Sequence, residues 1–162
     1  EFLEAGIEPV SALRTLNAAL VLRGEEGGGF TTIDLLALQR PTGAGTLYKY
    51  GAAPSYLKRG GCVTRVTGQS LPAGLQQGAD GPESTRLSLQ AGSFFVMVSD
   101  GVADETDDEW LQNLMAGWSG QSAEALASLI LSESRTRRGL RDDCAVLVLH
   151  LPKMEDSPPR QV

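Results

Sequence analysis

The segment FFVMVSDG (residues 94–101) begins with five apolar residues and ends in Ser99, Asp100 and Gly101. Apolar residues without polar alternation predict a strand over Phe94–Val98 that is buried on both faces. Such a strand would fix the position of the Asp100 carboxylate, and Gly101 would allow backbone or a ligand to approach closely. A structural alternative fits the same residues, with Asp100 starting a turn or capping the next helix.

A second segment, RDDCAVLVL (residues 141–149), places Asp142 and Asp143 directly before an apolar strand predicted over Ala145–Leu151. Hard divalent cations take carboxylate oxygens as ligands, so this pair is a candidate metal site. The alternative is an ordinary solvated loop. Both segments put aspartate at the border of a buried strand, and a sheet can bring the two borders to one rim.

The rest of the sequence predicts short strands between helices. Helical spacing of Val10, Leu13, Leu16, Leu20 and Val21 predicts an apolar helix face over Pro9–Arg23. Further helices are expected at about Glu105–Trp118 and from Ser122 to about Arg137, and strands at Phe30–Arg40, Thr46–Ala53, Ser55–Arg59, Cys62–Thr67 and Arg86–Gln90. Short turns make the strands mostly antiparallel, which predicts an α/β (α+β) fold with helices covering a sheet or a pair of sheets.

Composition narrows the classes of function. The 162 residues carry 20 acidic and 14 basic side chains, for a net charge of -6. This excess of acid disfavours binding to nucleic acid or to anionic membranes. No apolar run approaches the roughly 18 residues of a membrane span. We expect Cys62 and Cys144 to be reduced, partly buried thiols rather than a disulfide or a metal site.

Five short segments, in order, resemble the second part of a PPM-type phosphatase, the protein phosphatase 2C superfamily. They are FTTID (30–34), KYGAAPSYLKRG (49–60), SLPAGL (70–75), VSDG (98–101) and DDCAV (142–146). Within the superfamily the chain is most similar to the stage II sporulation protein E family, through PSYLKRG (54–60) and Arg135-Thr136-Arg137. The resemblance runs from Glu1 to about Leu151.

The resemblance implies an α-β-β-α sandwich of two mainly antiparallel sheets flanked by helices. It also implies a pair of manganese or magnesium ions at one rim. Asp100 and Asp142 match metal-ligand positions of the family, and Gly101 matches the glycine beside the site. No ligand role is carried over to Asp143.

The family's first metal aspartates lie upstream of the matched region, and nothing between Glu1 and Phe30 matches them. We therefore expect residues 1–151 to be the C-terminal portion of a phosphatase domain, incomplete at its N-terminus, and residues 152–162 to be a polar tail. This portion alone is expected to be inactive. Open strand edges, above all at Phe30–Leu38, predict a homo-oligomer.

The implied function is metal-dependent hydrolysis of phosphoserine or phosphothreonine on a regulatory protein. The resemblance points to a phosphorylated anti-anti-sigma factor that controls sporulation sigma-factor activation. It further implies a cytoplasmic domain whose parent is anchored to the cell membrane by an upstream region. The alternative is a phosphatase-like binding or regulatory module without catalysis.

Overall fold

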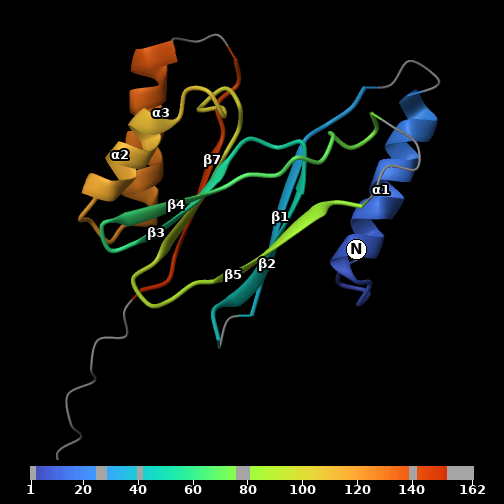
Figure 1. Cartoon of the computed structure of the whole chain (residues 1–162), viewed down its shortest axis with the longest axis horizontal. Coiled ribbons are helices and arrows are strands. Elements are labelled where there is room, and N and C mark those ends of the chain that lie inside the picture. The colour runs from blue at the N-terminus through green and yellow to red at the C-terminus, as the bar shows by residue number, and fades with distance from the viewer. Residues whose placement is uncertain (1–2, 25–28, 40–41, 76–80, 139–141, 153–162) are drawn as a thin grey trace, which may run out of the picture. The chain divides into compact units, whose positions relative to one another are not determined.

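The computed structural model describes residues 3–24, 29–39, 42–75, 81–138 and 142–152. Its helices and strands follow one another along the chain in the order labelled in Figure 1. The chain divides into two compact units, one formed by residues 1–54 with 66–88 and the other by residues 55–65 with 89–162. Within the described ranges, none of the helices has the length and apolar character needed to cross a bilayer.

The first unit contains a three-stranded antiparallel sheet in the order β1-β2-β5. The strands are β1 (Ile33–Leu38), β2 (Ala44–Tyr50) and β5 (Glu83–Ser88). β5 begins three residues before the predicted Arg86, because Glu83 already pairs with Lys49. Among the described strands, β1 lies at an edge of its sheet, as the sequence predicts. The homo-oligomer inferred from that edge stays a prediction.

Helix α1 (Pro9–Gly24) belongs to the same unit and packs on its sheet through buried Leu13. The residues around Leu13 are Tyr50 and Ala73, with Leu20, Ile33, Leu35 and Tyr48 packed against them. The predicted apolar face is wrong at Leu16, which is 41% exposed. Asn17 is buried instead, because its Oδ1 accepts a hydrogen bond from the Gly74 N–H at 2.8 Å.

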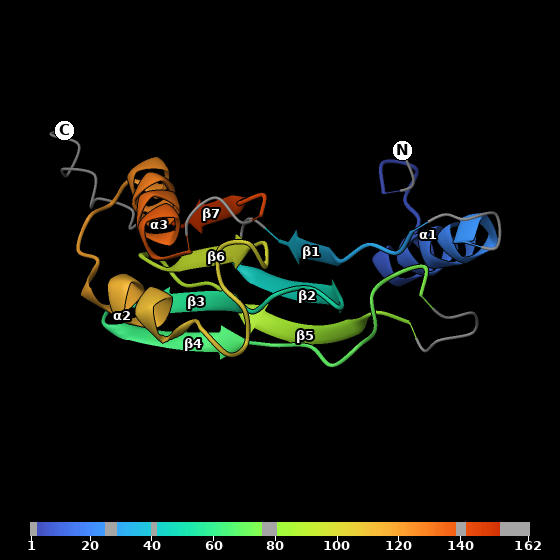
Figure 2. The same ribbon diagram turned by 90° about the horizontal axis from the view of Figure 1, so that it is seen from above.

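The second unit contains a four-stranded sheet in the order β4-β3-β6-β7. Figure 2 shows these four strands side by side in that order. Its strands are β3 (Ser55–Arg59), β4 (Cys62–Val66), β6 (Phe94–Val98) and β7 (Val146–His150). β6 runs antiparallel to both β3 and β7. Four of its five residues are buried, which confirms the central strand predicted from the FFVMV run.

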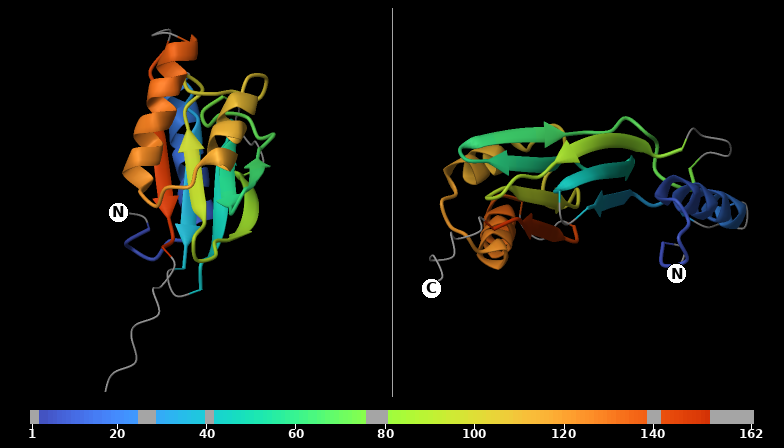
Figure 3. Two further views of the ribbon diagram at one scale, coloured as in Figure 1. Left: turned by 90° about the vertical axis from the view of Figure 1, so that its left-hand side faces the viewer. Right: turned by 90° about the horizontal axis from the view of Figure 1, so that it is seen from below.

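Two helices complete the second unit, α2 (Glu109–Gly117) and α3 (Ala123–Arg138). Figure 3 shows α3 running alongside β7. α3 begins where predicted, since the Ser122 hydroxyl accepts a hydrogen bond from the Ala125 N–H at 3.1 Å. α2 begins four residues later than the predicted Glu105. The Asp104 carboxylate accepts hydrogen bonds from the backbone N–H groups of Thr106 and Asp107, and this turn occupies the preceding segment.

Two antiparallel sheets with accompanying helices confirm the predicted α/β fold class. Both cysteines are free thiols, as predicted. The expectation that both are partly buried is wrong for Cys62, which is exposed because its side chain points out of the solvent-facing side of β4. Cys144 is half-buried, as predicted, and lies just before β7.

Candidate functional site

The pairing of β6 with β7 brings the two aspartate segments together. Val98 lies opposite Val146, so the chain leaves β6 toward Asp100 beside the place where it enters β7 from Asp142. The Ser99 N–H donates to the Ala145 carbonyl at 3.0 Å and extends the ladder beyond the strands. The sequence-based expectation that one rim collects both segments is therefore confirmed for the backbone.

Ser99 joins the two segments a second time through its side chain. Its hydroxyl donates to the Asp143 carbonyl at 3.1 Å and accepts from the Ala145 N–H at 2.9 Å. The Ser99 side chain thus bonds to the backbone of both Asp143 and Ala145, on either side of Cys144. This fixes the spacing between the segments without using either candidate carboxylate.

Gly101 is buried where the segments touch most closely. A Cβ built on it would collide with the Asp143 carbonyl oxygen and would lie 3.3 Å from the Asp142 Cβ. Only a residue without a side chain fits this approach. The Asp142 side chain therefore starts next to the backbone that follows Asp100.

The carboxylates themselves face outward. Asp100, Asp142 and Asp143 are all exposed. Asp100 Oδ1 accepts a hydrogen bond from the Gly101 N–H at 3.1 Å, and Asp142 Oδ1 accepts one from the Asp143 N–H at 2.8 Å. Each bond orients one oxygen of its carboxylate. The pair presents hard oxygen ligands at one sheet end, the donor type that magnesium and manganese prefer.

Two carboxylates alone are few for a two-ion site. In the part of the chain that the structure describes, no group of three His, Cys, Asp or Glu side chains is placed to hold a metal ion. Asp100 and Asp142 therefore fit such a site as a portion of its ligands, and the remaining ligands would have to come from elsewhere.

A polar cluster behind the rim supports the turn at Gly101. Cys144 Sγ donates to the Gly101 carbonyl at 3.3 Å. Ser134 of α3 is fully buried, and its hydroxyl lies 3.5 Å from the Gly101 carbonyl and 3.4 Å from the Val102 carbonyl. Both side chains thus contact the Gly101 carbonyl, and Ser134 also contacts the Val102 carbonyl. Buried carbonyl groups need such partners, since an unsatisfied one destabilises the fold.

A second polar cluster in this unit holds the start of α2. Buried Asp108 accepts a hydrogen bond from the Tyr56 hydroxyl at 2.9 Å and pairs with Arg65, with 3.1 Å between Nε and Oδ2. Gln112 donates to the other carboxylate oxygen at 3.1 Å. Burial raises the pKa of Tyr56 well above its ordinary value, and the hydrogen bond to Asp108 raises that pKa further.

Two further polar side chains of this unit pack against aromatic rings. The His150 ring stacks on Phe94, with 4.1 Å between centroids, at the end of β7 away from Asp142. Arg137 lies over the Trp110 ring, 5.4 Å from its centroid, and pairs with Glu133 at 3.6 Å. Arg135 is exposed, and Arg141 lies outside the described residues.

Sequence reasoning assigned no role to Ser99, Cys144 or Ser134. Ser99 could have been found from its place directly before Asp100, where a short hydroxyl side chain reaches neighbouring backbone. Cys144 follows the aspartate pair and was interpreted only as a thiol. Ser134 carries no signal in the sequence, because its helix position becomes informative only once α3 is packed.

Comparison with known proteins shows the family to which the chain is related. The family model described as stage II sporulation protein E (SpoIIE) matches residues 1–152. The stage II sporulation protein E of Bacillus subtilis (strain 168) is 32% identical over 158 residues, covering 93% of this chain and 19% of that protein. The homologue from Priestia megaterium is 28% identical over 98% of this chain and 28% of its own length. The chain thus spans less than a third of either relative.

A similar solved structure contains the PP2C phosphatase domain and a fragment of the regulatory domain of SpoIIE from Bacillus subtilis. It has 29% sequence identity and a TM-score of 0.81, covering 93% of this chain and 47% of that one. The phosphatase domain of the same protein, presoaked with Mn, has 29% identity and a TM-score of 0.68 over 97% of this chain and 70% of that one. The chain belongs to the stage II sporulation protein E family.

Proposed function

We propose that this chain forms part of a metal-dependent protein serine/threonine phosphatase domain that hydrolyses phosphoserine or phosphothreonine on a regulatory protein. The observation that carries the proposal is the meeting of Asp100 and Asp142 at the paired ends of β6 and β7. Family membership supports it, as do similar structures of phosphatase domains, one of them presoaked with Mn.

In this proposal Asp100 and Asp142 hold two manganese or magnesium ions together with ligands from outside the described residues. Bound cations of this kind neutralise phosphate charge and make a bound water acidic enough to act as a nucleophile. The chain's own contribution is orientation. Ser99 fixes the spacing of the two segments, Gly101 permits their close approach, and Ser134 with Cys144 supports the turn.

The substrate that we propose is a phosphorylated anti-anti-sigma factor that controls sporulation sigma-factor activation. Its support is the membership in a sporulation protein family. We further propose that the domain is cytoplasmic, that residues 1–151 are the C-terminal portion of the phosphatase domain, and that an upstream region of the parent protein anchors it to the membrane.

The test is manganese-dependent phosphate release by the complete phosphatase domain that includes this chain. The substrates are a phosphorylated anti-anti-sigma factor and an unrelated phosphoserine protein at equal concentration. We expect phosphate release that requires manganese and is faster with the anti-anti-sigma factor. Equal rates on both proteins would contradict the proposed substrate but remain consistent with a phosphatase. An absence of phosphate release from either protein would contradict the proposal that the domain is an enzyme.

A second candidate is a binding or regulatory module with a phosphatase-like fold and no catalysis. The observation that favours it is that the described residues contain no group of three metal-ligating side chains. Titration calorimetry with manganese on residues 1–162 and on the complete domain separates the candidates. Two tightly bound ions in the complete domain support the enzyme, whereas an absence of binding in both supports the module.

A further inference from the structure

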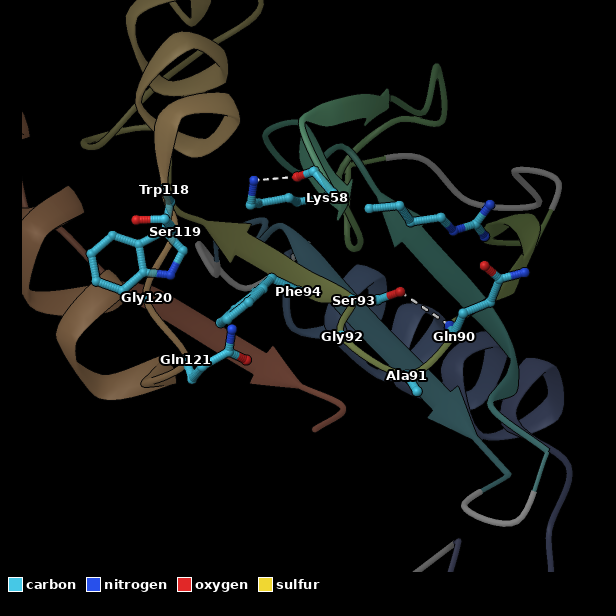
Figure 4. Close-up of a pocket in the computed structure, with 12 residues that line it drawn as sticks. Lys58, Gln90, Ala91, Gly92, Ser93, Phe94, Trp118, Ser119, Gly120 and Gln121 are labelled. Carbon is cyan, nitrogen blue, oxygen red and sulfur yellow. Dashed lines mark hydrogen bonds between the residues drawn. The ribbon is translucent and has the colours of Figure 1, made fainter. Parts of the chain in front are cut away.

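The second unit contains a cavity of about 400 Å³ at the end of β6 that lies away from Asp100. Figure 4 shows side chains that line it, among them Lys58 and Trp118. The ammonium group of buried Lys58 donates hydrogen bonds to the carbonyls of Gly60 and Ala116. Lys58 therefore has a structural role, because it joins the turn after β3 to the last turn of α2.

A larger cavity of the same unit, which we call the α2–α3 groove, has a volume of about 600 Å³ and lies on the other two elements that flank the sheet. Its lining includes Asp107, Glu109, Trp110, Leu114, Glu133 and Arg137. The half-buried tryptophan and leucine supply apolar surface. Of the lining residues that the structure describes, three are acidic and one is basic.

Both walls of the α2–α3 groove lead to the candidate metal rim. Asp107 follows Asp100 by seven residues, and its backbone N–H donates to the Asp104 carboxylate at 3.1 Å in the turn between them. On the other wall, the helical turn of α3 that lines the groove also carries Ser134, whose hydroxyl lies 3.5 Å from the Gly101 carbonyl. The groove is therefore a neighbour of the rim, unlike the cavity beside Lys58.

Arg137 shows which kind of group the groove accepts. Its guanidinium carbon lies 5.4 Å from the centroid of the Trp110 ring, and its Nε lies 3.6 Å from Glu133 Oε2. A cation over an indole face is attracted by the ring, and the carboxylate adds to that attraction. The Glu133 side chain is still 40% exposed, and Glu109 is exposed on the opposite wall. Both carboxylates are thus accessible to a further cation.

We propose that the α2–α3 groove is a docking site for an arginine or lysine side chain of the phosphorylated protein substrate, near its phosphorylated residue. This inference rests on the proposed function, which places the phosphate at the neighbouring rim. Charge complementarity favours a basic occupant. Its aliphatic stem would pack on Trp110 and Leu114, and its cationic end would lie near the carboxylates of Glu109 and Glu133.

The experiment measures manganese-dependent phosphate release by the complete phosphatase domain from two phosphoserine peptides. One peptide has arginines around the phosphoserine, and the other has glutamines in their place. We expect a KM about tenfold lower for the arginine peptide at an unchanged kcat, because docking away from the reacting atoms stabilises the bound substrate and the transition state equally. Equal KM values for the two peptides would overturn the proposal.

Glu109→Gln and Glu133→Gln each remove one carboxylate from the groove and keep the size of the side chain. Each should raise KM for the arginine peptide about threefold, and the double variant about tenfold, with no change for the glutamine peptide. Glu124→Gln is the matched control, because it removes an exposed carboxylate of α3 that does not line the groove. A preference for arginine that survives the double variant, or that falls equally in Glu124→Gln, would overturn the docking site.

A binding measurement separates this proposal from the proposed function. In the full chain with Trp118→Phe, Trp110 is the only tryptophan, so its emission reports on the groove. Titration with the unphosphorylated arginine peptide should give a saturable change, and the glutamine peptide should give none. This result without phosphate release would contradict the phosphatase but support a site for basic side chains. Phosphate release without a saturable change in emission would overturn the docking site and leave the phosphatase intact.

Discussion

The backbone carbonyl oxygen of Asp143 occupies the space in which a Cβ on Gly101 would lie. This contact sets how closely the ends of β6 and β7 approach. It predicts that Gly101→Ala forces the two segments apart, at a cost of about 1–3 kcal/mol in the free energy of unfolding. Urea denaturation measures this cost. Gly61→Ala is the control, because a Cβ there meets nothing within 4 Å.

Ser134→Ala should weaken the support of the turn after Asp100. The buried hydroxyl contacts the carbonyls of Gly101 and Val102, and its loss should cost about 1 kcal/mol. The complete domain should then need more manganese for half-maximal activity, which a purely structural role would not require. Ser132→Ala removes an exposed hydroxyl from the same helix and should change neither quantity. Identical manganese dependence in wild type and Ser134→Ala would argue against a positioning role.

Lys49 and Asp34 form a partly buried ion pair in the first unit, with 2.7 Å between Nζ and Oδ1. Lys49 is 2% exposed and also donates to the Ala53 carbonyl at 2.7 Å. Lys49→Met should lower the free energy of unfolding by about 3 kcal/mol, because it removes the ammonium group that pairs with the Asp34 carboxylate. The double variant Asp34→Leu with Lys49→Met should recover much of that loss. Equal stability of the single and double variants would contradict the ion-pair interpretation.

Tyr56 predicts a pH dependence of stability in the alkaline range. Its pKa is raised by burial and by the hydrogen bond to Asp108, so the folded chain keeps a proton that the unfolded chain loses above about pH 10. The stabilisation is complete below that pH and falls as the pH rises, by about 1.4 kcal/mol per pH unit.

Denaturation of wild type and Tyr56→Phe at a series of pH values isolates this effect from other titrating groups. The stability advantage of wild type should be constant up to about pH 9 and should shrink above pH 10. A difference that stays constant to pH 11 would mean that Tyr56 titrates normally in the folded chain.

Much of the fold could be predicted from local pattern. The run Phe94–Val98 lies in a central strand because a strand with two buried faces needs apolar residues throughout. Ser55–Arg59 was also predicted with its observed bounds. The errors occur where a polar side chain bonds to the backbone and overrides the apolar pattern. The Asp104 carboxylate holds a turn in a segment that was expected to be helical. The Asn17 amide oxygen accepts a hydrogen bond from the Gly74 N–H on a face that was expected to be apolar.

The candidate site was predictable only in outline. Asp100 and Asp142 stand out because each follows or precedes an apolar strand. Their proximity depends on the pairing of β6 with β7, which joins segments more than forty residues apart. No local sequence pattern indicates that these two strands pair. The supporting side chain of Ser134 comes from a helix between them, so its contact with Gly101 emerges only after packing.

The central claim is that Asp100 is a metal ligand of a phosphatase, and its most direct test is the manganese-dependent turnover of Asp100→Asn in the complete domain. We expect phosphate release to fall by about a hundredfold or more while the circular dichroism spectrum stays that of a folded domain. Glu124→Gln, which changes an exposed carboxylate in the first turn of α3, should retain full activity. Near-normal turnover of Asp100→Asn at the same manganese concentration would contradict the account.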